Sequence, residues 1–216
     1  MQKRLLITGG EGGIAMACRE EFQSRGWEVL APSRQELDVS DSESVEAFIN
    51  NCGPIDLLLC AAGVTDDCLL GKMSETSWDN VLDVNLKGAF RCARAVSAQM
   101  LRRRSGHVVF VSSHSAFKPP LGQANYAAAK AGLVAMGKSL AREWGSRSVR
   151  VNVITPGFLE TKMTEDVSDE VRQSALDKHT LGAFNTSENV ARFVHFLDQT
   201  MLQTSGQVFH LDSRVL

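Results

Sequence analysis

The sequence predicts an α/β fold built on a doubly wound, mostly parallel sheet of six or seven strands with helices on both faces. Short apolar runs bounded by turn residues alternate with longer stretches of helical period, which is typical of that architecture. Several runs are almost continuous in Val, Ile and Leu, as expected of strands buried on both faces. The 216 residues contain no linker, repeat or low-complexity tract, so one domain is expected over residues 1–216.

The predicted strands are short apolar runs, each followed by a turn or by the start of a helical pattern. In order, they cover residues 4–8, 28–31, 55–61, 107–112, 150–155 and 207–211.

The predicted helices lie between these strands, where apolar residues recur at helical spacing. They cover residues 14–25, 42–51, 77–104, 125–144, 168–178 and 187–200. Ser77 and Ser187 begin two of them. A serine hydroxyl accepts hydrogen bonds from the unpaired amides of a first helical turn, so both serines are expected to be N-caps.

The connection after the second strand is too short for a regular alternation. Between Ala31 and a strand-like segment at residues 37–39 there is no room for a helix, although a parallel crossover needs about a dozen residues. Either a helix is missing or the third strand is vestigial. The fold is therefore expected to be shortened after the second strand.

Charge and cysteine content argue against several classes of protein. A formal net charge of -2 provides no basic field for nucleic acid or anionic lipid. The amino terminus turns glycine-rich after a few apolar residues, unlike a secretory signal, and no run resembles a membrane span. The five cysteines show no CxxC spacing and indicate reduced thiols. We expect a cytoplasmic protein that binds neither nucleic acid nor membrane.

A glycine-rich turn, TGGEGGIA at residues 8–15, joins the first strand to the first helix. Glycines at such a turn let the backbone approach a pyrophosphate, and the helix N-terminus presents unpaired N–H groups to it. Gly9, Gly13 and Ala15 occupy the three small-residue positions, with Thr8 and Ile14 beside them. A tight turn without a ligand is the alternative.

Two further segments stand where a dinucleotide would cross the sheet. In open α/β sheets, ligands bind beyond the carboxyl ends of the strands. Asp38 and Val39 precede a polar turn, and Ala61, Ala62 and Gly63 follow a buried strand, so both segments are expected to flank the cofactor. Asp38 taken alone is more simply a turn or helix cap.

The residues after the second strand bear on the choice of cofactor. A carboxylate there would accept hydrogen bonds from the ribose hydroxyls, whereas a cation accommodates a 2′-phosphate. The sequence offers Arg34 and no carboxylate before Glu36. This favours NADP(H) through Arg34, with NAD(H) possible and a solvated surface arginine as the alternative.

The one tyrosine of the chain, Tyr126, stands four residues before Lys130 in a segment of high helix propensity. At that spacing the two side chains share one helix face. A free tyrosine has a pKa of about 10, and a neighbouring ammonium favours the ionised phenol. We therefore expect Lys130 to lower the pKa of Tyr126, which could then exchange a proton with a carbonyl or an alcohol.

Ser112 and Ser113 stand where the strand predicted at residues 107–112 ends. The end of a strand and the start of the next helix face the same edge of the sheet. The Ser113 hydroxyl could therefore polarise a substrate carbonyl where charge develops. The spacing favours Ser113, with Ser112 as a strand-end residue.

These motifs, in this order, resemble those of the short-chain dehydrogenase/reductase family, and most closely its 3-oxoacyl-carrier-protein reductase branch. The similarity runs nearly end to end and includes QANYAAAKAG at residues 123–132 and NVITPGFLET at residues 152–161. The resemblance implies a Rossmann fold, an NAD(P) cofactor and a homotetramer or homodimer formed through the helices at 77–104 and 125–144.

The resemblance also implies roles for individual residues. Ser113, Tyr126 and Lys130 match the catalytic triad of the family, and Lys130 would also bind the nicotinamide ribose. Asn85 matches the asparagine that anchors a water-borne proton relay to the lysine, although a buried asparagine that joins two segments is the alternative. The loop beside the nicotinamide would contribute Pro156, Gly157, Phe158 and Thr161.

The predicted function is thus NADPH-dependent reduction of a ketone or 3-oxoacyl-type carbonyl, in a small molecule or an acyl thioester, with Tyr126 as general acid. The segment at residues 162–185 would cover the substrate. The alternatives are an NAD-dependent secondary alcohol dehydrogenase and a catalytically silent dinucleotide-binding regulator. The intact Ser113, Tyr126 and Lys130 argue against the regulator.

The sequence departs from the family pattern at three further places. Cys60-Ala61 stands where two asparagines are usual, Glu11 places a negative charge in the phosphate turn, and residues 212–214 replace the common Asp-Gly-Gly ending. The first two are expected to affect cofactor binding. The basic residues 102–104 either complement a helix dipole or form a docking patch for an acidic carrier.

Overall fold

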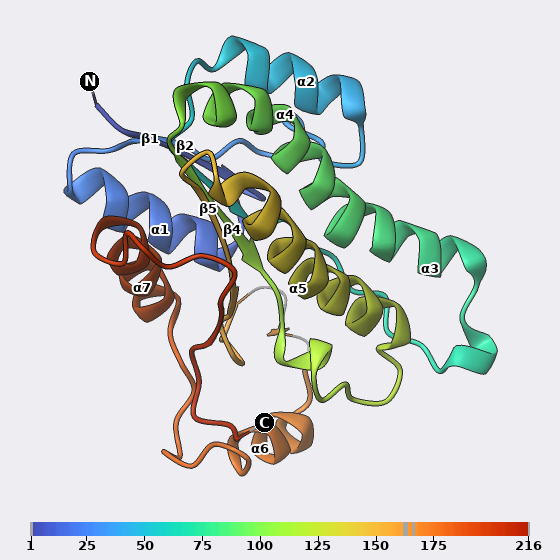
Figure 1. Cartoon of the computed structure of the whole chain (residues 1–216). Helices are drawn as coiled ribbons and strands as arrows, with labels where there is room; N and C mark the ends of the chain where they lie inside the picture. Colours follow the sequence, from blue (N-terminus) through green and yellow to red (C-terminus); the bar gives the residue numbers. More distant parts are fainter. Residues whose placement is uncertain (1, 162–163, 166, 216) are drawn as a thin grey trace.

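The computed structural model describes residues 2–161, 164–165 and 167–215. Its described strands form one parallel sheet in the order β2-β1-β3-β4-β5-β6 (Figure 1). The strands are β1 (Arg4–Thr8), β2 (Glu28–Leu30), β3 (Leu57–Cys60), β4 (Gly106–Val111), β5 (Val149–Thr155) and β6 (Val208–His210). The strand order reverses at β1, because β2 lies on one side of it and β3 on the other. In such sheets this reversal marks where a ligand binds.

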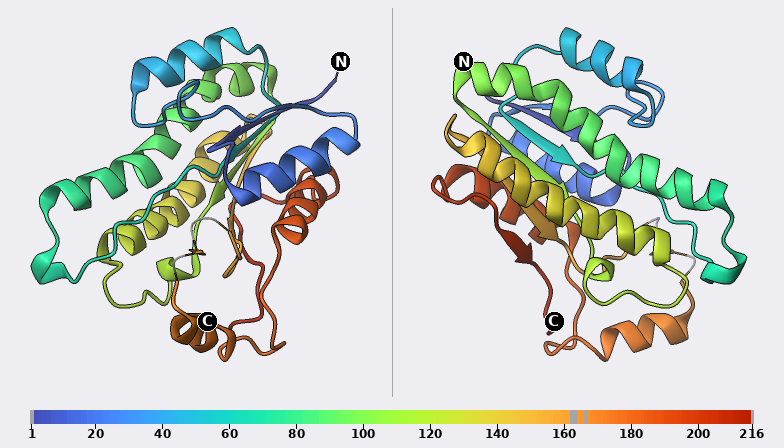
Figure 2. Two further views of the ribbon diagram at one scale, coloured as in Figure 1. Left: turned by 180° about the vertical axis from the view of Figure 1, so that it is seen from behind. Right: turned by 45° about the vertical axis from the view of Figure 1, so that its right-hand side comes forward.

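Helices cover both faces of the sheet (Figures 1 and 2). On one face, α1 (Gly13–Ser24) packs against α7 (Ser187–Gln199). The other face carries α2 (Ser42–Asn51), α4 (Gly88–Arg103) and α5 (Ala124–Gly145). The helix α3 (Glu75–Leu82) runs along α5, and α6 (Asp169–Leu176) lies beyond the end of the sheet. The doubly wound α/β fold predicted from the sequence is confirmed.

Alternation of side chains along the strands divides the core into two parts. Leu6, Leu58 and Val108 face α2, α4 and α5, whereas their neighbours Leu5 and Val109 face α1 and α7. Both sets are fully buried. The nearly continuous apolar runs are therefore explained by burial on two faces.

Neither a strand nor a helix forms between Ala31 and Asp41, so the sheet of the described residues has six strands and not seven. The strand-like prediction at residues 37–39 is wrong. Leu37 and Val39 are buried in the core on the α2 and α4 side. Gly88 allows the close contact with α4, because a Cβ there would lie 2.8 Å from Val39 Cγ2. Their apolar character reflects core packing of a loop.

In both helices for which a serine N-cap was predicted, a residue earlier in the sequence is the cap. Helix α3 is capped by Ser74, whose hydroxyl accepts from the Ser77 N–H at 3.0 Å, so Ser77 lies inside the helix. Helix α7 is capped by Thr186, which accepts from the Asn189 N–H at 3.2 Å, so Ser187 is its first residue. Where two hydroxyl residues lie within one turn of a helix start, the local sequence does not decide which of them caps the helix.

The single helix predicted at residues 77–104 is interrupted by a π-helical turn at Asp83–Lys87 between α3 and α4. Such turns hold one extra residue and are frequent at functional sites.

No helix in the described part of the chain has both the length and the apolar character that crossing a bilayer requires.

Candidate active site

The glycine turn after β1 is packed tightly against the end of β3. The Thr8 hydroxyl accepts from the N–H groups of Ala61 and Ala62, each at 3.1 Å. Gly9 adopts a φ of 73°, and a Cβ there would lie 2.8 Å from Ala62 Cα. A Cβ on Gly10 would overlap the Ala31 carbonyl oxygen. The glycines thus allow three strand ends to meet in one place.

The start of α1 is free of side-chain caps. Its N-cap is Gly12, which makes no side-chain hydrogen bond, and the helix begins at Gly13. A Cβ on Gly13 would lie 2.8 Å from Thr161 Cγ2, so the predicted phosphate turn and the loop after β5 are in contact. Uncapped N–H groups at a helix start are a site for a phosphate. The residues present therefore fit a dinucleotide, which Gly9, Gly13, Ile14 and Thr161 would hold.

On the side of β2, the structure joins two predicted residues to each other. Arg34 Nε lies 3.3 Å from Asp38 Oδ2, and the Arg34 side chain is largely exposed. Asp38 accepts from the N–H and hydroxyl of Ser40, which hold the pKa of its carboxyl below the usual range despite some burial. Asp38 thus caps a turn, the simpler of its two interpretations. Val39 is buried in the core, and its carbonyl oxygen accepts from Arg91 at 3.1 Å.

Arg19, which was not predicted from the sequence, stabilises the side of the site next to β2. Its guanidinium donates to the carbonyl oxygens of Ala31 at 3.1 Å and Gly10 at 3.5 Å. Those bonds tie the glycine turn to the end of β2. A single arginine on a helix gives no sequence signal for such contacts.

Tyr126 and Lys130 lie near the start of α5, as their spacing predicts. Lys130 Nζ lies 5.5 Å from the centroid of the Tyr126 ring and donates to the Val111 carbonyl oxygen at 2.9 Å. Ser112 also anchors this helix, because its hydroxyl donates to the Lys130 carbonyl oxygen at 2.8 Å. The end of β4 and the helix α5 are thereby held together.

The structure does not show the predicted lowering of the Tyr126 pKa by Lys130. Burial raises the pKa of Tyr126 to about 12, and a hydrogen bond with Ser113 only partly opposes the rise. The ammonium lies over the ring and bonds to Val111, not to the phenol oxygen. Burial also lowers the pKa of Lys130 to about 8. A phenol that keeps its proton is suited to the role of an acid.

Asn85 lies in the π-helical turn, where its amide group is held firmly. Its Nδ2 donates to the carbonyl oxygens of Val64 and Val81, both at 2.8 Å. Its Oδ1 is buried and has no hydrogen-bond partner. A Cβ on Gly63 would lie 2.6 Å from this oxygen and 3.5 Å from Lys130 Nζ. An unpaired buried acceptor thus faces the same small space as the ammonium, as a bound water would require.

The loop after β5 is fixed by the carboxyl-terminal segment. Gly157 adopts a φ of 93°, and a Cβ there would lie 2.6 Å from Asp212 Cβ. The Pro156 carbonyl oxygen accepts from Asn185 Nδ2 at 3.0 Å, and the rings of Phe158 and Phe184 lie 4.5 Å apart. The segment predicted to cover the substrate is therefore bound to this loop, although residues 162, 163 and 166 lie outside the described residues.

A hydrogen-bonded chain of three residues next to Ser113 was not predicted. Gln123 Nε2 donates to Asp67 Oδ2 at 2.7 Å, and the Ser115 hydroxyl donates to Gln123 Oε1 at 2.8 Å. The Ser115 N–H donates to the Ser113 hydroxyl oxygen at 3.2 Å. Gln123 stands three residues before Tyr126, a spacing that could have placed it near the site. Asp67 arrives from another loop, which no local pattern reveals.

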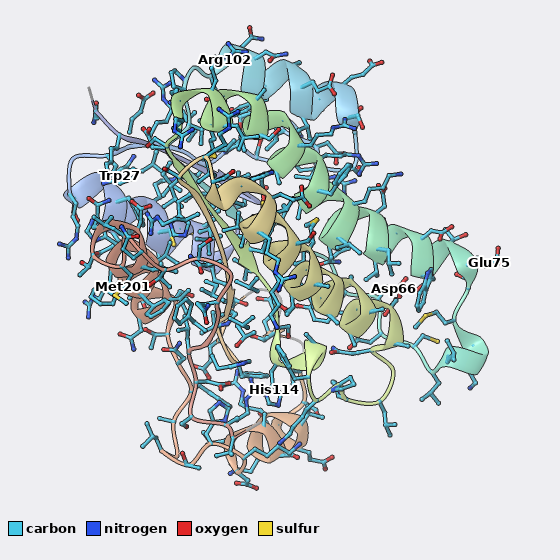
Figure 3. The ribbon with its side chains drawn as sticks, viewed as in Figure 1. Trp27, Asp66, Glu75, Arg102, His114 and Met201 are labelled. Carbon is cyan, nitrogen blue, oxygen red and sulfur yellow. The ribbon has the colours of Figure 1, made fainter. Side chains whose placement is uncertain are left out.

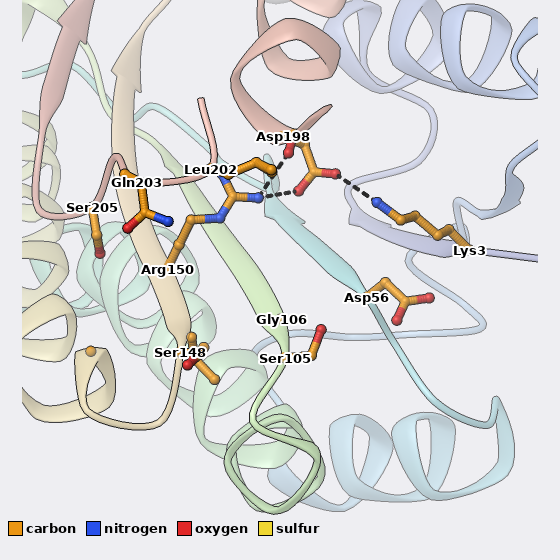
Figure 4. Close-up of a pocket in the computed structure, with 12 residues that line it drawn as sticks. Lys3, Asp56, Ser105, Gly106, Ser148, Arg150, Asp198, Leu202, Gln203 and Ser205 are labelled. Carbon is orange, nitrogen blue, oxygen red and sulfur yellow. Dashed lines mark hydrogen bonds and ion pairs between the residues drawn. The ribbon is translucent and has the colours of Figure 1, made fainter. Parts of the chain in front are cut away.

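The site lies at the end of the sheet that faces α6, where Figure 3 labels His114, the neighbour of Ser113. The pocket drawn in Figure 4, of about 420 Å³, lies at the opposite end, beside Lys3, Asp56 and Arg150. None of the predicted site residues lines that pocket.

The basic residues 102–104 contribute in part to the stability of the fold. The Arg103 guanidinium lies 3.7 Å from the Asp56 carboxylate, and Arg104 donates a hydrogen bond to the Ser146 carbonyl oxygen.

A strand order that reverses at β1, a glycine turn that leads into an uncapped helix, and a phenol beside a buried ammonium define a dinucleotide-dependent oxidoreductase. The family model described as short chain dehydrogenase matches residues 33–172, and the chain belongs to that family. It is accordingly an NAD(P)-dependent oxidoreductase.

Relatives match along nearly the whole chain. The 3-oxoacyl-acyl-carrier-protein reductase of Thermotoga maritima is 38% identical, with 97% of this chain and 96% of the relative covered. The enzyme of the same name from Escherichia coli strain K12 is 34% identical, with the same coverage of both chains. The crystal structure of gox2181 superimposes with a TM-score of 0.88 at 25% identity, and covers 98% of this chain and 95% of that one.

Proposed function

We propose that the protein is an NADPH-dependent reductase of a ketone, of the 3-oxoacyl thioester type, with Tyr126 as its general acid. The observation that carries the proposal is the meeting of Ser113, Tyr126 and Lys130 at the end of the sheet where the uncapped start of α1 lies. The names of the relatives at 34–38% identity support the class of substrate.

The chain's own residues divide the work of the reaction. When bound, the reduced cofactor supplies hydride to the carbonyl carbon. Ser113 donates a hydrogen bond to the carbonyl oxygen, and Tyr126 gives that oxygen its proton. Lys130 binds the ribose and holds positive charge beside the phenol. Asn85 holds the water through which the proton is replaced.

The preference for NADPH depends on Arg34. Its guanidinium is exposed and its ion pair is with the partly buried carboxylate of Asp38, so it can turn toward a 2′-phosphate at little cost. Titration of the protein with NADPH and with NADH, followed by intrinsic fluorescence, measures this preference. Tighter binding of NADH would favour the NAD-dependent alcohol dehydrogenase.

We further propose that the protein acts in the cytoplasm as a homotetramer or homodimer. Phe90 on α4 supports an interface there, because this large apolar residue is 43% exposed in the single chain. Light scattering measures the assembly, and a stable monomer would contradict this part of the proposal.

The reaction is tested with a panel of ketones and 3-oxoacyl thioesters, assayed with both reduced cofactors, beside Tyr126→Phe. This substitution keeps the ring and removes the proton, so kcat should fall by about 100-fold or more while NADPH binding is retained. Undiminished turnover by Tyr126→Phe would overturn the assignment of the acid. Binding of NADPH without reduction of any ketone would favour the silent regulator.

A further inference from the structure

Asp67 is connected to Ser113 by a series of three hydrogen bonds that passes through Gln123 and Ser115. The Asp67 carboxylate accepts from the Gln123 amide, and Gln123 accepts from the Ser115 hydroxyl. The Ser115 backbone N–H then donates to the Ser113 oxygen. The loops of Asp67 and Gln123 are joined twice more, by Cys68 N–H to the Gly122 carbonyl oxygen at 2.9 Å and by Asn125 Nδ2 to the Asp66 carbonyl oxygen at 3.0 Å.

The charge of Asp67 sets the direction of the two side-chain bonds in this series, whereas the backbone N–H of Ser115 can only donate. An ionised carboxylate only accepts, so the Gln123 amide must turn its NH₂ group toward Asp67 and its oxygen toward Ser115. The Ser115 hydroxyl must then donate to that oxygen. The backbone N–H of Ser115 occupies an acceptor position of Ser113, which leaves the Ser113 proton free to point toward the phenol or a substrate oxygen.

The charged groups near the phenol lie on two elements. Lys130 comes from the same helix and faces the ring, and Asp67 comes from the loop after β3. The negative charge of Asp67 raises the pKa of Tyr126, whereas the bond with Ser113 lowers it. The carboxylate and the hydroxyl thus act on the phenol in opposite directions.

We propose that Asp67, Gln123 and Ser115 are positioning residues that fix the direction in which Ser113 donates its proton at the site. The inference rests on the proposed function, in which Ser113 orients the carbonyl oxygen. Asp67 and Gln123 belong to different loops, so their contact also couples the turn after β3 to the start of α5.

The chain's one tyrosine makes a direct test possible. Incorporation of 3-fluorotyrosine into the full-length protein places a single fluorine in the site, whose NMR resonance reports ionisation of the phenol without any turnover. The fluorine also lowers the phenol pKa toward an accessible range. Three variants are compared with the parent: Asp67→Asn, Gln123→Leu and the control Asp66→Asn.

The two network variants should shift the titration in opposite directions. Asp67→Asn keeps an acceptor for Gln123 and removes the charge, so the midpoint should fall by about half a pH unit. Gln123→Leu releases Ser115 and Ser113, so the midpoint should rise. It should also lower kcat by about tenfold with a smaller change in KM, because orientation is lost. Asp66→Asn removes the same charge one residue away and should leave the midpoint within about a tenth of a unit of the parent.

A loss of folding alone would not give shifts of opposite sign. Where Gln123→Leu does not fold, Ser115→Ala removes the hydroxyl that donates to Gln123, keeps the backbone N–H, and should raise the midpoint in the same way. Shifts in the same direction, no shift, or an equal effect of Asp66→Asn would overturn the inference. If the opposite shifts occur but Tyr126→Phe still turns over, the proposed function fails and the network stands.

Discussion

Lys130 illustrates how burial sets the chemistry of a single residue. Its side chain is buried at the end of β4, with the Val111 carbonyl oxygen as a neutral acceptor for the ammonium. Burial penalises the charged form, and the pKa of Lys130 falls to about 8. The residue therefore changes its charge close to the pH at which the enzyme would work.

This pKa predicts an alkaline limit to reduction. Because the pKa of Lys130 is lowered, the ammonium is lost as pH rises through about 8, and kcat/KM for the ketone should decline there. Lys130→Arg keeps its charge in this range, so whatever activity remains should decline only at higher pH. A parent profile that stays flat to about pH 10 would contradict the prediction.

At the scale of elements, the connection between β1 and α1 shows why the turn is rich in glycine. Gly10 lies directly against Ala31 at the end of β2, and its N–H donates to the Pro32 carbonyl oxygen at 3.1 Å. Arg19 holds the same two segments from the side of α1. The position of the glycine turn thus depends on backbone contacts that a side chain would separate.

Gly10→Ala should therefore weaken both stability and cofactor binding. The added methyl group would overlap the Ala31 carbonyl oxygen, and the backbone shift should cost about 1–3 kcal/mol of unfolding free energy. Urea denaturation and NADPH titration measure the two effects. Gly145→Ala is the matched control: a methyl group added there meets open space, and alanine favours the helix, so stability should be unchanged or higher.

Local pattern predicted the elements well and their details less well. The period of apolar residues located the strands and helices, and the four-residue spacing placed Tyr126 and Lys130 together. The same signals could not choose between Ser74 and Ser77 as caps, nor show that Leu37 and Val39 pack as a loop. They also could not reveal Asp67 beside Gln123, since that contact depends on how two distant loops meet.

Across the whole molecule, the two ends of the sheet carry different polar groups. The carboxyl end has the unpaired Asn85 oxygen, whereas the amino end has a buried hydrogen-bonded network around Asp198, which Figure 4 shows beside Arg150 and Lys3. There Asp198 accepts from His107 and Arg150, each at 2.9 Å. Asn152 lies 3.1 Å from the other ring nitrogen of His107. This network ties α7 to β4 and β5.

The network predicts a loss of stability in acid. Burial lowers the pKa of His107, so the unfolded chain takes up a proton below about pH 6.5 while the folded chain resists it. Burial opposes ionisation of Asp198, but His107 and Arg150 hold its pKa below the ordinary value, so its contribution is lost at lower pH still. The unfolding free energy should fall by up to about 1.4 kcal/mol per pH unit for one such group.

Urea denaturation at about pH 7.5 and pH 5.5 measures this dependence. His107→Gln should be less stable at the higher pH, because Asp198 loses one of its buried partners, yet it should show a shallower decline in acid. Equal stability of the parent protein at both values would count against a neutral buried His107.

The sheet stops at β2, a strand of three residues followed by a connection without regular structure. The alignment with the Thermotoga maritima enzyme runs over 237 positions, more than the 216 residues here, so that relative carries segments this chain lacks. An outer strand with an open ladder accepts an added neighbour without disturbing those beneath it. Residues 31–41 are therefore a natural point for grafting a further strand and helix onto this edge of the sheet.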